Sequence, residues 1–162
     1  MVDVHTREQR HLNMSRIRGK NTKPELMLRQ GLHAGGMRFR LHRRDLPGTP
    51  DIVFPCRRAA VFVHGCFWHG HTCPMFKVPA TRTDFWLAKI ASNIGRDAEA
   101  LAKLQALGWR TGIVWECALR GKGRQPQDAV ARQVHSFVQN DALTTTIAGN
   151  FGRIPKPPPA DS

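Results

Sequence analysis

The sequence VFVHGCFWHGHTC, at residues 61–73, joins a short apolar run to a stretch of chemically reactive side chains. Its first three residues are β-branched or aromatic, which is typical of a buried strand. Three histidines, two cysteines and a Phe-Trp pair follow directly. The stretch therefore predicts a strand that ends in a loop whose side chains can bind metal ions and transfer protons.

Four side chains in and after this loop match the ligand set of a structural zinc site. Cys66, His71 and Cys73 lie in the loop, and Cys117 follows a second apolar run at residues 113–115. Three thiolates and one imidazole form a closed tetrahedral set for Zn²⁺. The sequence therefore predicts a structural zinc ion held by these four residues.

Alternatives to this ligand set stay open. His64 or His69 could replace His71, because sequence alone does not rank neighbouring imidazoles. The cysteines could also be free buried thiols or disulfides, although no export signal is seen and a reducing compartment is expected. Cys56 lies in an expected turn and is interpreted as a spare thiol.

His64 and His69, if they do not bind zinc, flank the aromatic pair Phe67-Trp68 at the end of the strand. Imidazoles titrate near neutral pH, so they can exchange protons around a phosphate that is being hydrolysed. The alternative is that both are solvated loop histidines. Phe67 and Trp68 either pack over the zinc site or form a rigid wedge that enters a base stack, to which Trp86 could add a third ring.

The charge of the chain indicates a polyanionic partner. Lysine and arginine number 25 against 12 acidic residues, which gives a formal net charge of +13 over 162 residues. Nucleic acid is the commonest partner of so basic a chain. No apolar segment approaches the length of a membrane span, so a membrane partner is not expected. The length is most simply one domain.

The excess positive charge is concentrated near the N-terminus, because eleven basic and only three acidic residues lie in the first 44 positions. Residues 2–21 are polar and have few apolar anchors. We interpret them as an arm whose Arg16, Arg18 and Lys20 contact DNA phosphates, and the alternative is a solvated tail.

The rest of the pattern predicts a small α/β domain. Thr22 and Glu25 form a capping box for a helix that ends at Gly35-Gly36. Glu25 could also serve an active site as an acid, and the two roles compete. The other expected elements are strands at residues 37–42, 52–54, 59–64 and 109–115, a long helix over 84–107 with Thr83 as N-cap, and a weak helix near 128–138. This order is typical of a mixed sheet flanked by helices.

Pro50-Asp51 opens the strand at residues 52–54, and this layout resembles the restriction-endonuclease-like fold. That fold usually has an acidic residue, any residue and lysine on the next strand, whereas this chain has Phe62-Val63-His64. A histidine there is a feature of the very-short-patch-repair (Vsr) mismatch endonucleases. The chain resembles that family in NM at 13–14, NT at 21–22, LPG at 46–48, HGCFWH at 64–69, FKVPATRT at 76–83, FWL at 85–87, RD at 96–97 and VWECALRG at 114–121.

The resemblance implies a nickase that cuts DNA on the 5′ side of the thymine in a T:G mismatch left by deamination of 5-methylcytosine. It implies that Asp51 binds a catalytic Mg²⁺ directly, with the main-chain carbonyl of Val63 beside it. Glu25, His64 and His69 would hold metal-bound waters or the scissile phosphate, with His69 the first choice for proton transfer.

The same resemblance assigns the remaining site residues. The structural Zn²⁺ would be held by Cys66, His71, Cys73 and Cys117. The wedge that enters from the major groove would consist of Phe67, Trp68 and Trp86. The basic arm would clasp the opposite face of the duplex.

The expected organisation is an arm at residues 1–21, an endonuclease core at residues 22–140 and a tail at residues 141–162 that is disordered in part. The expected partner is double-stranded DNA with a T:G mismatch, with mismatch-repair proteins and a DNA polymerase acting downstream. The enzyme would act as a monomer in the bacterial cytoplasm, associated with the nucleoid. Two alternatives are a restriction-type enzyme that cuts both strands of matched DNA and a zinc-stabilised DNA-binding module without chemistry.

Overall fold

The structure is a computed structural model and describes residues 20–151 of the 162-residue chain. The expectations for Arg16, Arg18 and the arm up to residue 19 lie outside the described residues. The same is true of the segment after residue 151.

The described chain contains a five-stranded sheet whose strands keep their sequence order in space. The strands are β1 (Arg40–Leu41), β2 (Ile52–Phe54), β3 (Ala59–His64), β4 (Arg110–Trp115) and β5 (Thr144–Ile147). β1, β2 and β3 pair antiparallel, whereas β3, β4 and β5 pair parallel. The predicted mixed sheet in an α/β domain is therefore confirmed.

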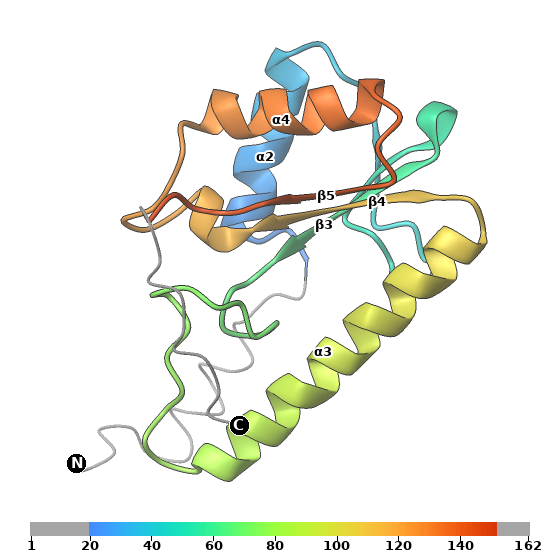
Figure 1. Cartoon of the computed structure of the whole chain (residues 1–162). Helices are drawn as coiled ribbons and strands as arrows, with labels where there is room; N and C mark the ends of the chain where they lie inside the picture. The colour runs from blue at the N-terminus through green and yellow to red at the C-terminus, as the bar shows by residue number, and fades with distance from the viewer. Residues whose placement is uncertain (1–19, 152–162) are drawn as a thin grey trace, which may run out of the picture.

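Helices cover both faces of this sheet. They are α2 (Lys23–Ala34), α3 (Thr83–Ala106) and α4 (Gln127–Gln139), and the two latter lie within one or two residues of their predicted ranges. Figure 1 shows α2 and α4 together on one face, with α3 running beneath the other. Within residues 20–151, no helix combines the length and the apolar character that crossing a membrane requires.

Alternate residues of β2 and β3 face the two helical layers. Ile52 and Val61 belong to the cluster that includes Leu28 of α2, whereas Val53 belongs to the cluster that includes Leu104 of α3. Both faces of these strands are thus buried, which explains why β3 reads as an unbroken apolar run. β3 pairs with β2 over residues 59–61 and with β4 over its whole length, so the pairing with β4 fixes the position of its last residues.

Both predicted helix caps differ in detail from the structure. Thr22 occupies the N-cap position of α2, but its side chain makes no capping hydrogen bond. The Glu25 carboxylate instead accepts the N–H of Asn21 at 3.1 Å, so the predicted capping box is wrong. Thr83 is the first residue of α3 rather than its N-cap, and its hydroxyl donates to the carbonyl of Pro79 at 3.0 Å.

The strand predicted over residues 37–42 is reduced to the two exposed residues of β1. His42, which follows β1, has a φ of 45°, a left-handed conformation that ends the strand. The prediction made this histidine the last residue of a strand. The turn instead directs its ring into the cleft described below.

β5 lies in the segment that was predicted to be a tail. It pairs with β4, and Ile147 is buried. Just beyond it, Gly149 donates its N–H to Cys117 Sγ at 3.2 Å. A Cβ at Gly149 would lie 2.5 Å from the Cys117 carbonyl oxygen, so only glycine permits this approach. The folded core therefore extends beyond residue 140.

Candidate active site and metal centre

The directions of the strands bring distant segments to one edge of the sheet. β2 runs antiparallel to β3, so Asp51, which precedes β2, lies beside the end of β3. β4 runs parallel to β3 with Trp115 paired to His64, so the short 3₁₀ helix η2 (Glu116–Ala118) begins at the same edge. Two sets of reactive side chains meet there.

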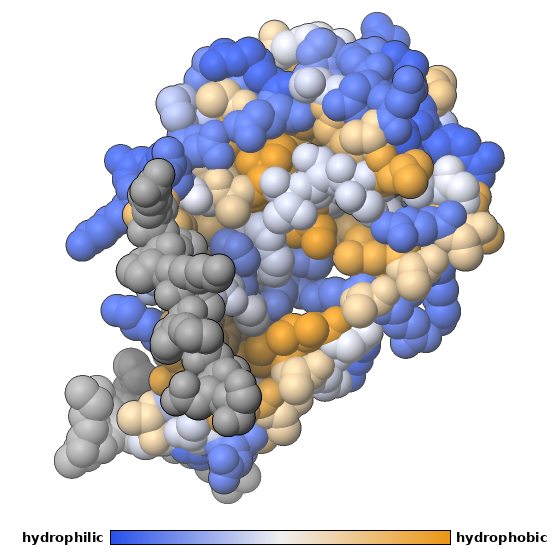
Figure 2. All heavy atoms as spheres, in the orientation of Figure 1, coloured by the Kyte–Doolittle hydropathy of each residue, from blue (hydrophilic) through white to orange (hydrophobic). Residues whose placement is uncertain are grey.

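A cleft of about 510 Å³ opens between this edge and α3. Figure 2 shows the surface hollowed between the sheet and the long helix. The titratable side chains that line the cleft are Lys20, His42, Arg44, Asp51, His64, His69, Arg96 and Asp97, and Val63 lies among them. The predicted residues Asp51, Val63, His64 and His69 are thus brought together, and Lys20 of the predicted DNA-contacting set is in the same cleft.

Asp51 is held by the backbone of the neighbouring strand. Its Oδ2 accepts the N–H of Val63 at 2.7 Å. Burial raises the pKa of Asp51 to about 7; the Val63 N–H opposes this shift, and the neighbouring Glu25 carboxylate adds to it. The negative charges of Asp51 and Glu25 repel each other where little water can screen them. A divalent cation bound beside them would stabilise both charged carboxylates. The oxygen donors at this site fit Mg²⁺.

Glu25 is almost fully buried and lies behind the cleft, where several donors converge on it. Its Oε2 accepts hydrogen bonds from Arg29 Nη2 at 2.7 Å and from the Asn21 N–H at 3.1 Å. His42 Nε2 lies 3.0 Å from the same oxygen. Arg29 Nη2 also donates to Asn21 Oδ1 at 2.9 Å. Glu25 therefore anchors Asn21, two residues before α2, and contacts His42, which lines the cleft.

His64 and His69 stack on each other inside the cleft, with ring centroids 3.8 Å apart and planes 3° from parallel. Burial, with a contribution from the neighbouring His69 ring, lowers the pKa of His64 to about 4. His64 is therefore a neutral imidazole at neutral pH. Its Nδ1 is buried and has no hydrogen-bond partner among the described residues.

Asp97, on α3, forms the partner of His69. Its Oδ2 lies 2.5 Å from His69 Nδ1. A carboxylate on Nδ1 favours a proton on that nitrogen and leaves Nε2 as the atom that can exchange a proton with a ligand. The His69–Asp97 pair is thus arranged for proton transfer.

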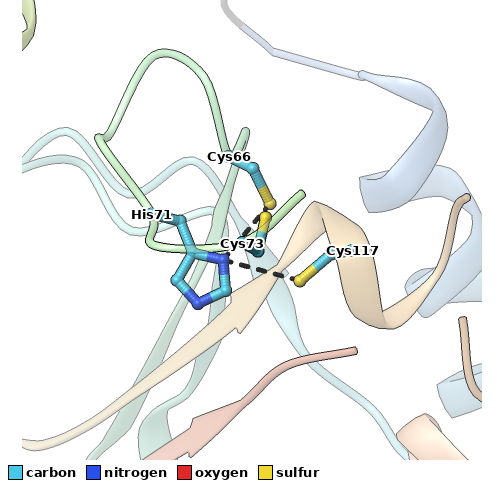
Figure 3. Close-up of side chains that lie close together, drawn as sticks. All are labelled: Cys66, His71, Cys73 and Cys117. Atoms are coloured by element: carbon cyan, nitrogen blue, oxygen red, sulfur yellow. Dashed lines mark hydrogen bonds between the residues drawn. The ribbon is translucent and has the colours of Figure 1, made fainter. Parts of the chain in front are cut away.

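The Cys/His cluster lies beside this cleft, on the loop after β3 and on η2. Figure 3 shows the side chains of Cys66, His71, Cys73 and Cys117 pointing toward one another. Their ligand atoms all lie within 4.8 Å of one another, and His71 Nδ1 is 3.5 Å from both Cys66 Sγ and Cys117 Sγ. The structure therefore brings together the four predicted ligands, and neither His64 nor His69 belongs to this cluster.

The surroundings of the cluster also suit a bound cation. Burial raises the pKa of the Cys66 and Cys117 thiols, so a cation would be needed to keep them as thiolates. The N–H of Cys66 donates to Glu116 Oε1 at 3.3 Å, which fixes the loop to η2. All cysteines of the chain are free, and Cys56 is exposed and remote from the cluster. The alternative of disulfides is therefore wrong.

Trp115 lies between the two sites. Its ring stacks on that of His71, with centroids 4.2 Å apart and planes at 11°. It also makes an edge-to-face contact with His64, with centroids 5.3 Å apart and planes at 70°. The Cys/His cluster and the two histidines of the cleft are thus joined through the ring of Trp115.

The aromatic residues of the loop form a cluster with the start of α3. Trp68 and Phe67 lie 5.8 Å and 5.6 Å from Trp86 between ring centroids. The Trp68 carbonyl accepts a hydrogen bond from Asn93 Nδ2 at 2.9 Å, which fixes the loop to α3. Lys89 Nζ lies 5.9 Å from the Trp68 ring centroid. The rings are half-buried, and a basic side chain borders them.

Three residues of the site were missed by sequence reasoning. His42 and Arg29 contact Glu25, and Asp97 contacts His69. Asp97 had a detectable signal, because it lies seven residues after Ile90 and seven before Leu104, on the buried face of α3. A carboxylate on that face needs a partner.

Comparisons with known proteins agree with this picture. A family model described as DNA mismatch endonuclease Vsr matches residues 2–75. The type II nicking enzyme V.XorIIP of Xanthomonas oryzae pv. oryzae is 53% identical over 123 residues, which is 76% of this chain and 90% of that protein. The DNA mismatch endonuclease Vsr of Escherichia coli is 44% identical over 147 residues, 91% of this chain and 94% of that protein. Identity of this level over most of both chains shows that the protein belongs to the Vsr family of DNA mismatch endonucleases.

Proposed function

We propose that this mismatch endonuclease nicks DNA on the 5′ side of the thymine in T:G mismatches that arise from deamination of 5-methylcytosine. The observation that carries the proposal is the cleft in which Asp51, the Val63 backbone and two histidines converge. The resemblance to Vsr enzymes supports the substrate. The restriction-endonuclease-like fold is part of the same proposal, supported by Asp51 at the start of β2 beside the end of β3.

Asp51 and the Val63 carbonyl would hold Mg²⁺. When bound, Mg²⁺ would make water more acidic and neutralise negative charge that develops on the phosphate. Lys20, Arg44 and Arg96 border the same cleft and would attract the DNA backbone.

His69 would move the proton in this reaction. Its Nδ1 is occupied by Asp97, so Nε2 is the nitrogen that would take a proton from water or give one to the leaving oxygen. His64 stacks on His69 and is neutral at pH 7, so it orients the ring without adding charge repulsion. Glu25 would act with them by holding water or phosphate in place.

Cys66, His71, Cys73 and Cys117 would hold a structural Zn²⁺ that fixes the loop after β3. That loop presents Phe67 and Trp68, which with Trp86 would enter the base stack from the major groove. Unstacking a base step normally costs a few kcal/mol. A T:G step stacks weakly, so opening it would cost less. The lower cost at a mismatch would contribute to recognition.

This activity would take place on bacterial DNA in the cytoplasm, with a monomer sufficient to cut one strand. Mismatch-repair proteins and a DNA polymerase would act on the nicked product. Arg16 and Arg18 would contact phosphates together with Lys20.

The testing experiment is a nicking assay on a duplex with one labelled T:G mismatch in a methyltransferase-type site, beside its T:A control, with and without Mg²⁺. We expect a metal-dependent cut 5′ of the thymine in the mismatched duplex alone. Asp51→Ala should abolish the cut while DNA binding survives, whereas Asp45→Ala, which changes an exposed carboxylate paired with Arg43, should cut normally.

Three outcomes would contradict the proposal. Cleavage of both strands in matched DNA would indicate a restriction-type enzyme. Tight binding without a cut in any mismatch context would indicate a DNA-binding module. Undiminished cleavage by Asp51→Ala would exclude the proposed metal site.

A further inference from the structure

The ring of Trp115 contacts a histidine of the cleft, and the proposed mechanism does not use it. Trp115 is the last residue of β4 and is paired in register with His64, the last residue of β3. Paired residues on neighbouring strands project to the same face of a sheet, so the two side chains meet at its edge. Their rings lie edge to face, with centroids 5.3 Å apart. Trp115 therefore forms one wall of the space in which the His64 ring lies.

Other rings surround the imidazole of His64 as well. The ring of Phe62, two residues earlier on the same strand, has its centroid 5.6 Å away, and the ring of His69 stacks on it at 3.8 Å. The buried Nδ1 of His64 has no hydrogen-bond partner within residues 20–151. The orientation of the His64 ring therefore depends on how closely its neighbours pack against it.

Trp115 is itself held by the Cys/His cluster. Its ring lies within 11° of parallel to that of His71, with centroids 4.2 Å apart. His71 Nδ1 faces the Cys66 and Cys117 thiols, each at 3.5 Å. The cluster thus fixes the plane of the His71 ring, and the stacked ring of Trp115 carries that restraint to His64.

The orientation of the His69 ring decides where its Nε2 points. The contact between its Nδ1 and Asp97 Oδ2 fixes one atom, about which the ring can still tilt. The face of His64 limits this tilt, because the two stacked planes lie only 3° from parallel. His64 and Asp97 together therefore set the direction of the nitrogen that the proposed mechanism uses.

We propose that Trp115 is a positioning residue of the cleavage reaction, and that its flat ring, packed between the Cys/His cluster and His64, holds the stacked His64 and His69 rings in place. The inference rests on the proton transfer that the proposed function assigns to His69. A displacement of about 1 Å at a reacting group can slow a reaction roughly 100-fold. The described residues that line the cleft do not include Trp115, so losing its ring should slow the chemical step without weakening DNA binding.

The test compares two apolar substitutions of Trp115 in the full-length protein. Trp115→Phe keeps a flat ring, whereas Trp115→Met keeps a long apolar side chain without a flat face. In single-turnover cleavage of a T:G duplex with Mg²⁺, we expect Trp115→Met to lower the rate at saturating enzyme by roughly 10- to 100-fold, with an unchanged dissociation constant for DNA. Trp115→Phe should stay within about threefold of the wild type.

Trp109→Met is the matched control. Trp109 is also a half-buried tryptophan, but it packs against the cluster that includes Leu104, and its ring lies 5.7 Å from the Arg58 guanidinium. This variant should cleave at the wild-type rate. Melting temperature and zinc content are measured for every variant, and all rates are taken below the lowest melting temperature.

Nuclear magnetic resonance of the protein without DNA gives a readout that does not depend on activity. Nuclear Overhauser contacts between the rings of Trp115 and His64 should be present in the wild type. The Nδ1–H signal of His69, which reports its contact with Asp97, should shift or broaden in Trp115→Met and keep its position in Trp115→Phe and Trp109→Met. Absence of the Trp115–His64 contacts in the wild type would overturn the inference without reference to any variant.

The failure of this inference can be separated from the failure of the proposed function. If the wild type cleaves and Trp115→Met cleaves equally fast with the same His69 signal, Trp115 does not position the histidines although the proposed function stands. Equal losses in Trp115→Phe and Trp115→Met would also overturn the inference, because a flat ring would then give no advantage. If the wild type cleaves no mismatched duplex, the proposed function is wrong, and the inference fails with it even where the resonances place Trp115 against His64.

Discussion

Asp97 determines which nitrogen of His69 faces the cleft. An amide at this position would bond less strongly to His69 Nδ1 and would allow the ring to take the other tautomer or rotate. We expect Asp97→Asn to lower the nicking rate on the order of 100-fold or more, the size of a lost acid–base contribution, while DNA affinity is unchanged. Single-turnover nicking with a separate binding assay measures both.

Asp84→Asn is the matched control, because it changes an exposed carboxylate in the first turn of the same helix. Its nicking rate should equal that of the wild type. Equal rates for wild type and Asp97→Asn would show that His69 does not need this partner.

The buried Asp51 makes the stability of the protein depend on pH. Its pKa of about 7 in the folded protein is above its ordinary value near 4, so the folded state holds the proton more tightly than the unfolded chain. The contribution of this group to the free energy of unfolding is fully present below about pH 4 and is lost as the pH rises through 7. In buffer without added Mg²⁺, Asp51→Asn should therefore stabilise the protein by up to a few kcal/mol at pH 8 and by less at pH 5.

Thermal unfolding at the two pH values measures this difference. Asp45→Asn provides the control, because the neighbouring Arg43 lowers the pKa of that exposed carboxyl. If Asp51→Asn stabilises the protein by the same amount at pH 5 and pH 8, Asp51 does not have a raised pKa in the folded state.

At the scale of elements, the loop after β3 depends on the cluster of cysteines and His71. Structural zinc sites contribute folding free energy directly. We expect Cys66→Ser and Cys117→Ser to lose zinc and to unfold at a markedly lower temperature, whereas Cys56→Ser, at an exposed position, should behave like the wild type. Metal analysis should give one zinc ion per chain in the wild type.

Wild-type protein that is soluble and active without zinc would refute a structural role for zinc at this cluster. Cys56→Ser variants as unstable as the two buried ones would show that the loss comes from thiols in general rather than from the cluster.

Hydrophobic pattern was sufficient to predict the buried elements of the fold. The unbroken apolar run of β3 and the helical spacing of Ile90 and Leu104 in α3 both report burial, which dominates the folding free energy. The short β1 was not predictable in the same way, because alternation over residues 37–42 implied a full strand. Its end is set by the backbone turn at His42, which depends on tertiary contacts with Asp51.

At the scale of the whole molecule, β5 completes the sheet, and Gly149 just beyond it contacts the Cys/His cluster. A chain that ends at residue 140 would lose the pairing of β5 with β4 and the hydrogen bond from Gly149 to Cys117 Sγ. We expect this truncated chain to fold poorly and to bind zinc weakly. A chain that ends at Phe151 should keep the melting temperature and zinc content of the full protein.

Circular dichroism and metal analysis of the two truncated chains test this expectation. If the chain ending at residue 140 unfolds at the same temperature as the full protein, β5 is not part of the stable core.

The sequence was sufficient to predict most residues of the site but not how they are arranged in space. Asp51 and the end of β3 stood out because a proline-flanked acid and several histidines are unusual beside apolar runs. Their meeting depends on β2 running antiparallel and β4 parallel to β3, and local sequence does not specify pairing direction. The partners His42 and Asp97 join the site through that tertiary arrangement.

One carboxylate, Glu25, joins the chain entering α2 to the catalytic cleft. The Asn21 N–H, Arg29 and His42 all meet at its Oε2, and Asn21 itself has a left-handed φ of 57° that is held by these contacts. If DNA binding changes the placement of Asn21 and this change alters the affinity of the cleft for a cation, linkage requires that the cation alters DNA affinity by the same factor. Under the proposed function, DNA binding and cation binding would then be coupled through the Glu25 carboxylate.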